Sequence, residues 1–489
     1  MRPRLELLDR PLLERIVAEA LQLIEQPGAR VSPHVVELLR DAGVQVENGV
    51  AHFPEALARK ALAGVPHEFY LYSRDGQPAV HYGGEDVHFD PGSSCLNILD
   101  SETQQPRPAQ AADLVRMVQL AEMLPEFAAQ STAMVCNDVP QDAGDWYRLF
   151  LVLYYSSKPV VTGAFSGPSL RAMLDLLALE SGGAEALRQK PRAVFDVCPS
   201  PPLNWSDFAS QNLVGLARAG VPAEIVSMPL AGATAPVTLI GSVVQHAAEC
   251  ISGVVIHQLA CPGAPIVWGG APAIFDMRTG VTSMGSIETA MLDLACAQVG
   301  KYLGLPTHGY LVNSDGKYLD GQAGMESGTS AVLGALGGIN MISGAGMLDF
   351  VACHSLEKLV VDAEAIASAK RLIAGIEPRS DSLATAMFAK TGLSGDFLKL
   401  QETRALFRKE QHFPSAVIDR GGPSFSDGSG SAEAPDLFAR AHTRVEELVA
   451  AYQRPTLDPD REQALVAFAE REGAKAGLNS LPGIAKVLA

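Results

Sequence analysis

Cysteine is scarce in this sequence, and its spacing excludes two common kinds of structural site. The seven cysteines are scattered and odd in number, and no two of them form a CxxC pair. Such a set fits neither a disulfide framework nor a tetrahedral zinc site, and it is typical of reduced thiols in the cytoplasm. We therefore expect a cytoplasmic protein without a bound metal.

The chain as a whole has few positive charges, and its N-terminus lacks a long apolar run. The chain has 38 Lys and Arg against 55 Asp and Glu, a net charge of −17, so nucleic acid and anionic membranes would be repelled. The first residues, MRPRLELLDRPLLER, are charged throughout and lack the apolar stretch of a signal peptide or a membrane span. We expect no nucleic-acid and no membrane partner, whereas a cationic substrate or a basic partner protein suits this charge.

The sequence also lacks the fingerprint of a nucleotide-binding turn. The first βα units contain no glycine-rich strand-to-helix turn followed about 20 residues later by an acid, which disfavours nicotinamide and S-adenosylmethionine as cofactors. The sequence therefore predicts no tightly bound cofactor.

What the sequence does contain is a regular alternation of apolar runs and amphipathic segments. From about residue 105 onward, the two alternate at intervals of roughly 35 to 45 residues. Strands that read as continuous apolar runs are buried on both faces, and eight βα units favour a closed barrel over an open sheet. The sequence thus predicts an α/β fold, a TIM (β/α)8 barrel. Seven runs are visible and an eighth strand is expected near 397–400; the seven lie at 128–135, 158–165, 192–197, 223–228, 264–270, 307–312 and 339–344.

The 489 residues exceed the about 250 that a barrel needs, so further elements must decorate it. Residues 1–104 are expected to form an N-terminal α+β cap with an Asp-Gly hairpin turn at 75–76. The barrel is expected over 105–420. Residues 421–489 should begin with a glycine-rich loop (421–435) and continue as C-terminal helices. The helical patterns of the cap lie at 11–25, 33–42 and 54–63.

The loops after the fourth to seventh runs carry the residues expected to do chemistry, because reactive residues of a barrel lie at the carboxyl ends of its strands. These loops contain MPLAGATAPVTL, FDMRTG with GSIE, NSDGKYLDGQAG, and SGAGMLD with EKLVVD. In this order the motifs resemble the trimethylamine methyltransferase family, specifically its members without pyrrolysine, which include glycine betaine:corrinoid methyltransferases. The resemblance spans about residues 90–420. It implies a TIM barrel that acts with a small corrinoid-binding protein, and it makes a homo-oligomer plausible.

The resemblance also narrows the substrate. Pyrrolysine-bearing members place that residue just before the Ser-Asp of the sixth loop, where this chain has Asn313. A quaternary nitrogen already carries a positive charge and leaves as a neutral amine, so its methyl group can be attacked by Co(I) without an activating adduct. We therefore predict methyl transfer from a small, betaine-like quaternary amine to the Co(I) of a corrinoid carried by a partner protein.

Three groups of residues are predicted to form the site. Catalytic roles are expected for Asn313, Asp315 and Glu326, and corrinoid contacts for His308, His354 and Glu402. Aromatic faces attract quaternary ammonium, an acid balances its charge, and a cation meets the carboxylate of a betaine. The residues expected to bind substrate in these ways are Trp205, Trp268, Phe275, Tyr310, Asp276, Arg278 and Lys317. Each also has a structural alternative: packing for the aromatics, a salt-bridged turn for the charges, and a buried hydrogen-bonded ring for the histidines.

One stretch departs from the family pattern. Family members often have a His-Thr pair with a second His four residues beyond the first, but here Glu402 and Leu406 stand at those positions. We expect a shifted substrate, because an added carboxylate near the barrel mouth would suit a cation without a carboxylate of its own.

Three alternative functions stay open at this point. The chain could bind quaternary amines or the corrinoid partner without turnover, it could act on a tertiary methylamine, or it could be an unrelated barrel enzyme such as a lyase or decarboxylase. A requirement for a reduced corrinoid protein separates methyl transfer from the binding-only and unrelated-enzyme alternatives, and a panel of quaternary and tertiary amines separates the two substrate classes.

Overall fold

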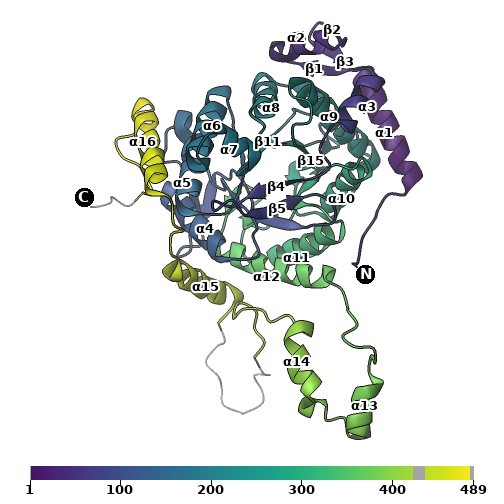
Figure 1. Cartoon of the computed structure of the whole chain (residues 1–489), viewed down its shortest axis with the longest axis vertical. Helices are drawn as coiled ribbons and strands as arrows, with labels where there is room; N and C mark the ends of the chain where they lie inside the picture. Colours follow the sequence, from purple (N-terminus) through teal and green to yellow (C-terminus); the bar gives the residue numbers. More distant parts are fainter. Residues whose placement is uncertain (1, 422–434, 485–489) are drawn as a thin grey trace.

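The apolar runs form parallel strands in the computed structural model, which describes residues 2–421 and 435–484 (Figure 1). Five strands pair in the order β9–β10–β11–β13–β15 and three in the order β18–β19–β6, and all of these pairs are parallel. Their bounds are β6 (His88–Pro91), β9 (Gln130–Ser131), β10 (Val160–Gly163), β11 (Ala193–Val197), β13 (Ala223–Ser227), β15 (Ile266–Gly270), β18 (His308–Tyr310) and β19 (Met341–Ala345).

Two contacts join these sheets at their edges. Trp268 of β15 bridges Thr307 beside β18, and the amide of Ala128, ahead of β9, donates to the carbonyl of Phe89 in β6 at 2.9 Å. The strands therefore close into one ring of parallel strands, here called the strand ring. The α/β class predicted from the sequence is confirmed.

A helix follows each strand of the ring, and Figure 1 shows these helices around the strands. Serine side chains cap several of them at the N-terminus: Ser206 for α8, Ser286 for α10 and Ser355 for α12. The helices are α4 (Ala111–Met123), α5 (Gly144–Tyr155), α6 (Gly167–Ser181), α8 (Asp207–Ala219), α9 (Leu239–Ala260), α10 (Ile287–Tyr302), α11 (Gly321–Leu336) and α12 (Leu356–Ile373), with the short α7 (Ala184–Gln189) after α6.

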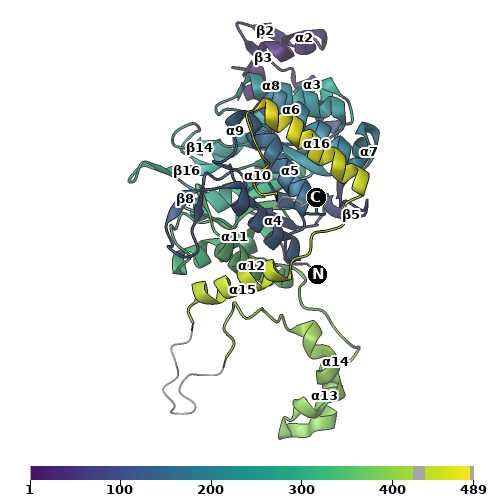
Figure 2. The same cartoon turned by 90° about the vertical axis from the view of Figure 1, so that its left-hand side faces the viewer.

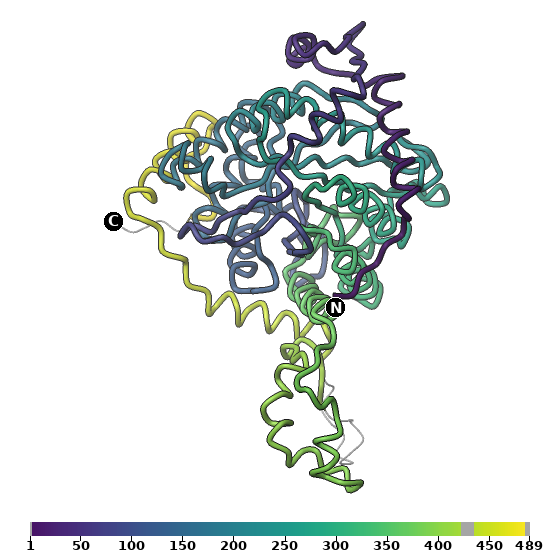
Figure 3. The backbone as a smooth tube through the Cα atoms, turned by 45° about the vertical axis from the view of Figure 1, so that its right-hand side comes forward, coloured from purple at the N-terminus to yellow at the C-terminus, as the bar shows by residue number. Residues whose placement is uncertain are grey.

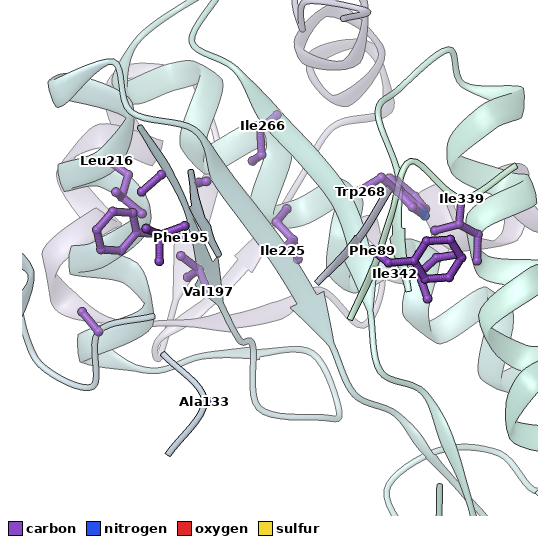
Figure 4. Packing of buried hydrophobic residues seen from close by; sticks show 14 of the residues in the cluster. Phe89, Ala133, Phe195, Val197, Leu216, Ile225, Ile266, Trp268, Ile339 and Ile342 are labelled. Carbon is purple, nitrogen blue, oxygen red and sulfur yellow. The ribbon is translucent and has the colours of Figure 1, made fainter. Parts of the chain in front are cut away.

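The outward faces of the strands bind these helices through apolar side chains. Figure 4 shows Phe195 of β11 beside Leu216 of α8, and Phe89 and Ile342 beside Ile339, all buried in one core. Because successive side chains of a strand point to opposite faces, the residues between these outward ones face the interior of the ring.

A hairpin fills one end of that interior. Strands β4 (Phe69–Tyr72) and β5 (Pro78–Tyr82) pair antiparallel around the Asp-Gly turn at 75–76, as predicted. Figure 1 shows the hairpin across the centre of the ring. Its buried side chains join inward residues of the strands in a separate apolar cluster: Leu71, Val80, Tyr82, Ala129, Val161, Val194, Val267 and Met341. A ligand can therefore enter the ring only from its other end.

The opposite end carries the loops and two small sheets. These sheets have the orders β14–β16–β17 and β20–β21–β7–β8. Their strands are β14 (Leu230–Ala231), β16 (Ala273–Asp276), β17 (Val281–Ser283), β20 (Met347–Leu348), β21 (Cys353–His354), β7 (Asn97–Leu99) and β8 (Pro106–Pro108).

The N-terminal helices were predicted correctly and pack beside α9. They are α1 (Arg10–Glu25), α2 (Pro33–Asp41) and α3 (Glu55–Ala63), with a sheet of β1 (Ala29–Val31), β3 (Val50–His52) and β2 (Gln45–Glu47) to which β12 (Asn204–Trp205) adds. Helix α9 is apolar and long enough to span a membrane, but 83% of its apolar window is buried inside the protein. It is a core helix of this fold.

The eighth strand is not where the sequence placed it. Residues Phe397–Lys399 form a short 3-10 helix, and Leu398 is 81% exposed, whereas a strand of the ring is buried on both faces. The eighth strand is β6, which pairs with β19. The strand ring thus begins before residue 105, whereas the barrel was expected from residue 105 onward. The division of the chain into domains at 1–104, 105–420 and 421–489 stays a prediction.

Residues 376–413 form an arm that leaves the body, as Figures 2 and 3 show. It contains α13 (Thr385–Thr391) and α14 (Gln401–Glu410). Helices α15 (Leu437–Ala451) and α16 (Pro459–Lys475) return to the body and confirm the predicted C-terminal helices. All but the two ends of the loop expected at 421–435 lies outside the described residues.

Candidate functional site

A cavity of about 700 Å³ lies at the carboxyl ends of the ring strands. Residues at or just beyond the ends of β10, β11, β13, β15 and β18 border it, which is where a barrel keeps its reactive groups. Three aromatic rings line it: Phe165, Phe208 and Tyr310. The polar side chains are Ser93, Ser94, Asp196, Ser200, Asn212, Thr282 and His308. Within residues 2–421 and 435–484, no lysine or arginine lines the cavity.

Two carboxyl groups face each other inside the ring beneath the cavity. Asp196 of β11 and Glu224 of β13 are register partners, and the two carboxyl groups are close enough for their charges to interact. Burial raises the pKa of Asp196 to about 7, and burial together with the neighbouring Asp196 carboxyl raises the pKa of Glu224 well above its usual value. Asp196 therefore carries the negative charge of the pair only above about pH 7, while Glu224 keeps its proton.

His308 connects this pair to a third carboxyl. Its Nδ1 lies 3.2 Å from Oε1 of Glu224, its Nε2 lies 3.0 Å from the Ser343 hydroxyl, and Ser343 donates to Asp90 at 2.6 Å. Burial lowers the pKa of His308 to about 3, so the ring is neutral. The contact between Nδ1 and Glu224 is close but lacks the geometry of a hydrogen bond. Burial raises the pKa of Asp90 as well.

No cation neutralises these acids. Among the described residues, no lysine or arginine forms an ion pair with Asp90, Asp196 or Glu224, and the ring of His308 beside Glu224 is neutral. Tyr82, from the hairpin that closes the ring, adds a hydroxyl 3.4 Å from Glu224. A buried carboxylate without a partner is costly, so the site is poised to accept a positive charge from a ligand.

Two of the predicted site residues, Tyr310 and His308, line the cavity. The Tyr310 hydroxyl accepts a hydrogen bond from the Ser93 amide at 2.9 Å, which fixes the ring beside the cavity, and burial raises its pKa.

The predicted catalytic residues hold loops instead of lining the cavity. Asp315 accepts hydrogen bonds from the amides of Met284 (2.9 Å) and Gly285 (3.0 Å) and from the Ser283 hydroxyl. Glu326 accepts from the Asp315 amide at 2.9 Å. Since Met284 lines the cavity, Asp315 reaches the site through the position of that loop. Asn313, which is 2% exposed, donates to the Tyr310 carbonyl at 3.2 Å, and its Oδ1 has no hydrogen-bond partner among the described residues.

The two tryptophans lie on the outer side of the ring. Trp205 and Trp268 are each 1% exposed; Trp205 donates to Ser252 of α9 and Trp268 to the carbonyl of Cys296 of α10, both at 2.9 Å. These contacts are with the surrounding helices. The alternative of packing, weighed for both residues, describes their position in the structure.

The charged pairs predicted to bind substrate lie at the surface. Asp276 and Arg278 form a 2.8 Å ion pair on the hairpin of β16 and β17, and the Arg278 side chain is 90% exposed. Lys317 pairs with Asp349 at 3.3 Å and covers the ring of Phe350. Phe275, on β16, is half-buried and lies outside the cavity lining.

The remaining corrinoid candidates do not line the cavity either. His354 is fully buried beside Gly346, and burial lowers its pKa to about 3. Glu402 lies on α14 of the arm in an ion pair with Lys390. The carboxylate expected from Glu402 near the mouth is therefore not there, because the arm carries α14 away from the body.

Sequence reasoning missed the carboxyls inside the ring and two of the aromatics. Asp196 and Glu224 interrupt the apolar runs AVFDV and AEIVS, and a charged residue inside a strand buried on both faces is the signal that could have located them. Phe165 is the last residue of the second run (158–165), and Phe208 lies in the first turn of α8, the helix after the third run.

Comparisons with known proteins agree on one family. The family description "Trimethylamine methyltransferase (MTTB)" matches residues 1–477. The chain is 32% identical to the trimethylamine methyltransferase of Methanosarcina thermophila, over 92% of this chain and 93% of that one. It is 27% identical to the glycine betaine methyltransferase of Desulfitobacterium hafniense, over 97% and 98% of the two chains. Among solved structures, the monomethylamine methyltransferase of Methanosarcina barkeri is similar in fold, with a TM-score of 0.51 at 11% identity over 96% of this chain and 88% of that one. The chain therefore belongs to the trimethylamine methyltransferase family, which confirms the prediction of a corrinoid-dependent methyltransferase.

Proposed function

We propose that this chain moves a methyl group from a small quaternary amine to the Co(I) of a separate corrinoid protein, and that its strand ring is a TIM (β/α)8 barrel. The alternation of ring strands with outer helices and the fold of the related monomethylamine methyltransferase support the barrel. The relationship to a glycine betaine methyltransferase and the presence of Asn313 support a quaternary nitrogen.

One observation carries the proposal: the cavity brings aromatic faces and an unneutralised carboxyl group around the same space. The rings are Phe165, Phe208 and Tyr310, and the carboxyl is that of Asp196. Aromatic faces and a carboxylate both attract a quaternary ammonium, and the attraction is stronger in a cavity that excludes water. A neutral amine would gain little from either.

The mouth of the cavity suits a partner protein. Phe165, Phe208 and Met228 line the cavity but are 58%, 39% and 42% exposed. Exposed apolar side chains around a cavity are what a docked partner covers. The corrinoid of that partner would supply a cobalt nucleophile strong enough to take a methyl group from a quaternary nitrogen.

The residues of this chain then have three tasks. The aromatic rings and Asp196 hold the ammonium, and the hairpin below closes the cavity to water from the other side. Asp315 and Glu326 act as positioning residues, because they fix the loop that carries Met284. The amine leaves as a neutral tertiary amine, so no proton has to be supplied at the nitrogen.

The proposal is tested by incubating the purified protein with reduced cobalamin or a Co(I) corrinoid protein and a panel of quaternary and tertiary amines, while the absorbance reports corrinoid methylation. We expect methylation from quaternary amines. Methylation from tertiary amines alone would contradict the argument from Asn313, and tight binding without methylation would favour a barrel that only binds.

The cysteines bear on where in the cell the protein works. The seven cysteines are all free, which supports a cytoplasmic location. The homo-oligomer expected from the family resemblance stays a prediction.

A further inference from the structure

The charge around the cavity has one sign. Asp196 borders it, and Glu224 and Asp90 lie beneath it. Arg148, behind Ser94, has its guanidinium engaged by the Ser94 hydroxyl (3.0 Å), the Thr132 carbonyl (3.1 Å) and the Asp145 carboxylate (3.1 Å). Among the residues that the structure describes, a ligand carboxylate would therefore find no free cation in the cavity.

The cations once expected to bind a betaine carboxylate are engaged elsewhere. Arg278 pairs with Asp276 on an exposed hairpin, and Lys317 pairs with Asp349. Neither lines the cavity. A betaine would thus have to bury its carboxylate close to Asp196 without a counter-charge, which is unfavourable in an enclosed site.

Asn212 points to what the far end of the ligand carries. This residue lines the cavity and is 2% exposed. Its Nδ2 donates to the Ala164 carbonyl at 2.7 Å, so the orientation of the amide is determined and Oδ1 is the remaining acceptor. Oδ1 has no hydrogen-bond partner among the described residues. A buried acceptor of this kind favours a hydrogen-bond donor and repels a carboxylate.

His308 also lines the cavity and is 4% exposed, and its Nδ1 lies 3.2 Å from Oε1 of Glu224 without the geometry of a hydrogen bond. The aromatic rings of Phe165, Phe208 and Tyr310 complete a lining suited to methylated ammonium.

We propose that the cavity binds a small trialkylammonium cation that ends in a neutral hydroxyl group and not in a carboxylate, with Asp196 as its counter-charge and Asn212 as the acceptor for the hydroxyl. Choline is the simplest compound of this class. The inference rests on the proposed function and narrows its substrate class. The cavity lining thus indicates a cation without a carboxylate, which is the kind of substrate that the sequence suggested through Glu402.

The first experiment compares three ligands by isothermal titration calorimetry at pH 8 on the full chain. Choline and glycine betaine differ in one end group, and tetramethylammonium lacks that end altogether. We expect choline to bind at least tenfold more tightly than glycine betaine, with tetramethylammonium between them. Betaine binding as tight as choline binding overturns the proposal.

Two variants separate the roles of the counter-charge and the acceptor. Asp196→Asn should weaken both choline and tetramethylammonium at least tenfold, because it removes the charge and keeps the shape. Asn212→Leu should weaken choline several-fold and leave tetramethylammonium unchanged, which also shows that the variant is folded. Asp276→Asn, on the exposed hairpin, is the matched control and should change neither. Unchanged choline binding in Asp196→Asn contradicts the proposal.

The affinity should also depend on pH. The titratable groups around Asp196 carry no positive charge at neutral pH; they are Glu224 from β13, Asp90 from β6, His308 and Tyr310 from β18, Tyr82 from β5, and Cys198 just after β11. Choline binding should strengthen several-fold between pH 6 and pH 8 as Asp196 ionises, and this slope should vanish in Asp196→Asn. A slope retained in that variant contradicts the assignment of Asp196.

Failure of this inference can be distinguished from failure of the proposed function. Choline that binds through Asp196 but yields no methylated corrinoid refutes the methyl transfer and leaves the binding assignment. Methyl transfer from glycine betaine without choline binding refutes the substrate class and leaves the methyl transfer.

Discussion

The protonation of Glu224 sets the charge beneath the cavity. Its carboxyl lies between Asp196, the Nδ1 atom of His308 and the hydroxyl of Tyr82, with no cation nearby. If both Glu224 and Asp196 were ionised, two buried negative charges would face each other. A single shared negative charge matches a ligand with one positive charge, so the pair limits the site to monocations.

Replacing Glu224 by glutamine tests this at the level of protein stability. Because the folded pKa values of Glu224 and Asp196 are raised, the native state binds more protons than the unfolded chain, and stability falls as pH rises. Glu224→Gln should reduce the loss of stability between pH 5.5 and pH 8, measured as the urea midpoint, while choline binding stays within a few-fold.

Asp276→Asn is the control for that experiment. The hydrogen bond from Arg278 lowers the pKa of the Asp276 carboxyl to about 2, below the pH range tested. The control should therefore leave the pH dependence unchanged. An equal pH dependence in wild type and Glu224→Gln would show that Glu224 is ionised in the native state.

At the scale of elements, a buried ion pair on α12 joins this helix to α11 and to the loop after β19. Lys358 and Asp362 of α12 are paired within the motif EKLVVD; Lys358 also donates to Ser327 of α11 at 2.7 Å, and Asp362 accepts from the Gly346 amide after β19 at 2.7 Å. Both side chains are fully buried. The motif that marks the family is thus a structural joint at the carboxyl end of β19.

Lys358→Met should be strongly destabilising, because it leaves Asp362 buried without its partner. Breaking one side of such a pair costs about 3–5 kcal/mol, which is read from the shift of the urea midpoint. The double variant Lys358→Met/Asp362→Leu should recover much of that loss, since no buried charge is left unpaired. A double variant as unstable as the single one would argue that the hydrogen bonds, and not the charge, hold the joint.

The strands show which parts of the fold could be predicted from the sequence and which could not. Seven strands were predicted because their runs are mainly apolar, but β6 reads HFDP, in which only one of four residues is a large apolar one, so it was missed. The apolar residues 397–400 looked like a strand, yet they lie on the arm. Continuous apolar runs also hide which residues face inward. Trp268 of β15 is next to Val267, the residue that pairs with Glu224 of β13. Only the closed ring shows that the Trp268 side chain points outward and the Glu224 side chain points inward.

At the scale of the whole molecule, the arm and the ring are separable. The arm carries several exposed apolar side chains, among them Ile376, Leu383, Leu393, Leu398 and Phe413. None of its residues lines the cavity. The substitution of Glu402 and Leu406 for the family histidines therefore changes the arm and not the ligand site.

Arg371 joins the two ends of the arm, and we therefore expect that the arm can be excised. Its guanidinium donates to the carbonyls of Gly375 at 2.8 Å and Glu410 at 3.0 Å, so the two ends of the arm lie within reach of a short linker. Replacing residues 377–409 by a short Gly-Ser linker should leave choline affinity within about twofold and the thermal midpoint within a few degrees, because a short flexible loop closes the gap at low entropic cost. Loss of choline binding in a folded excision variant would mean that the arm reaches the ligand, and the assignment of the site to the ring interior would be wrong.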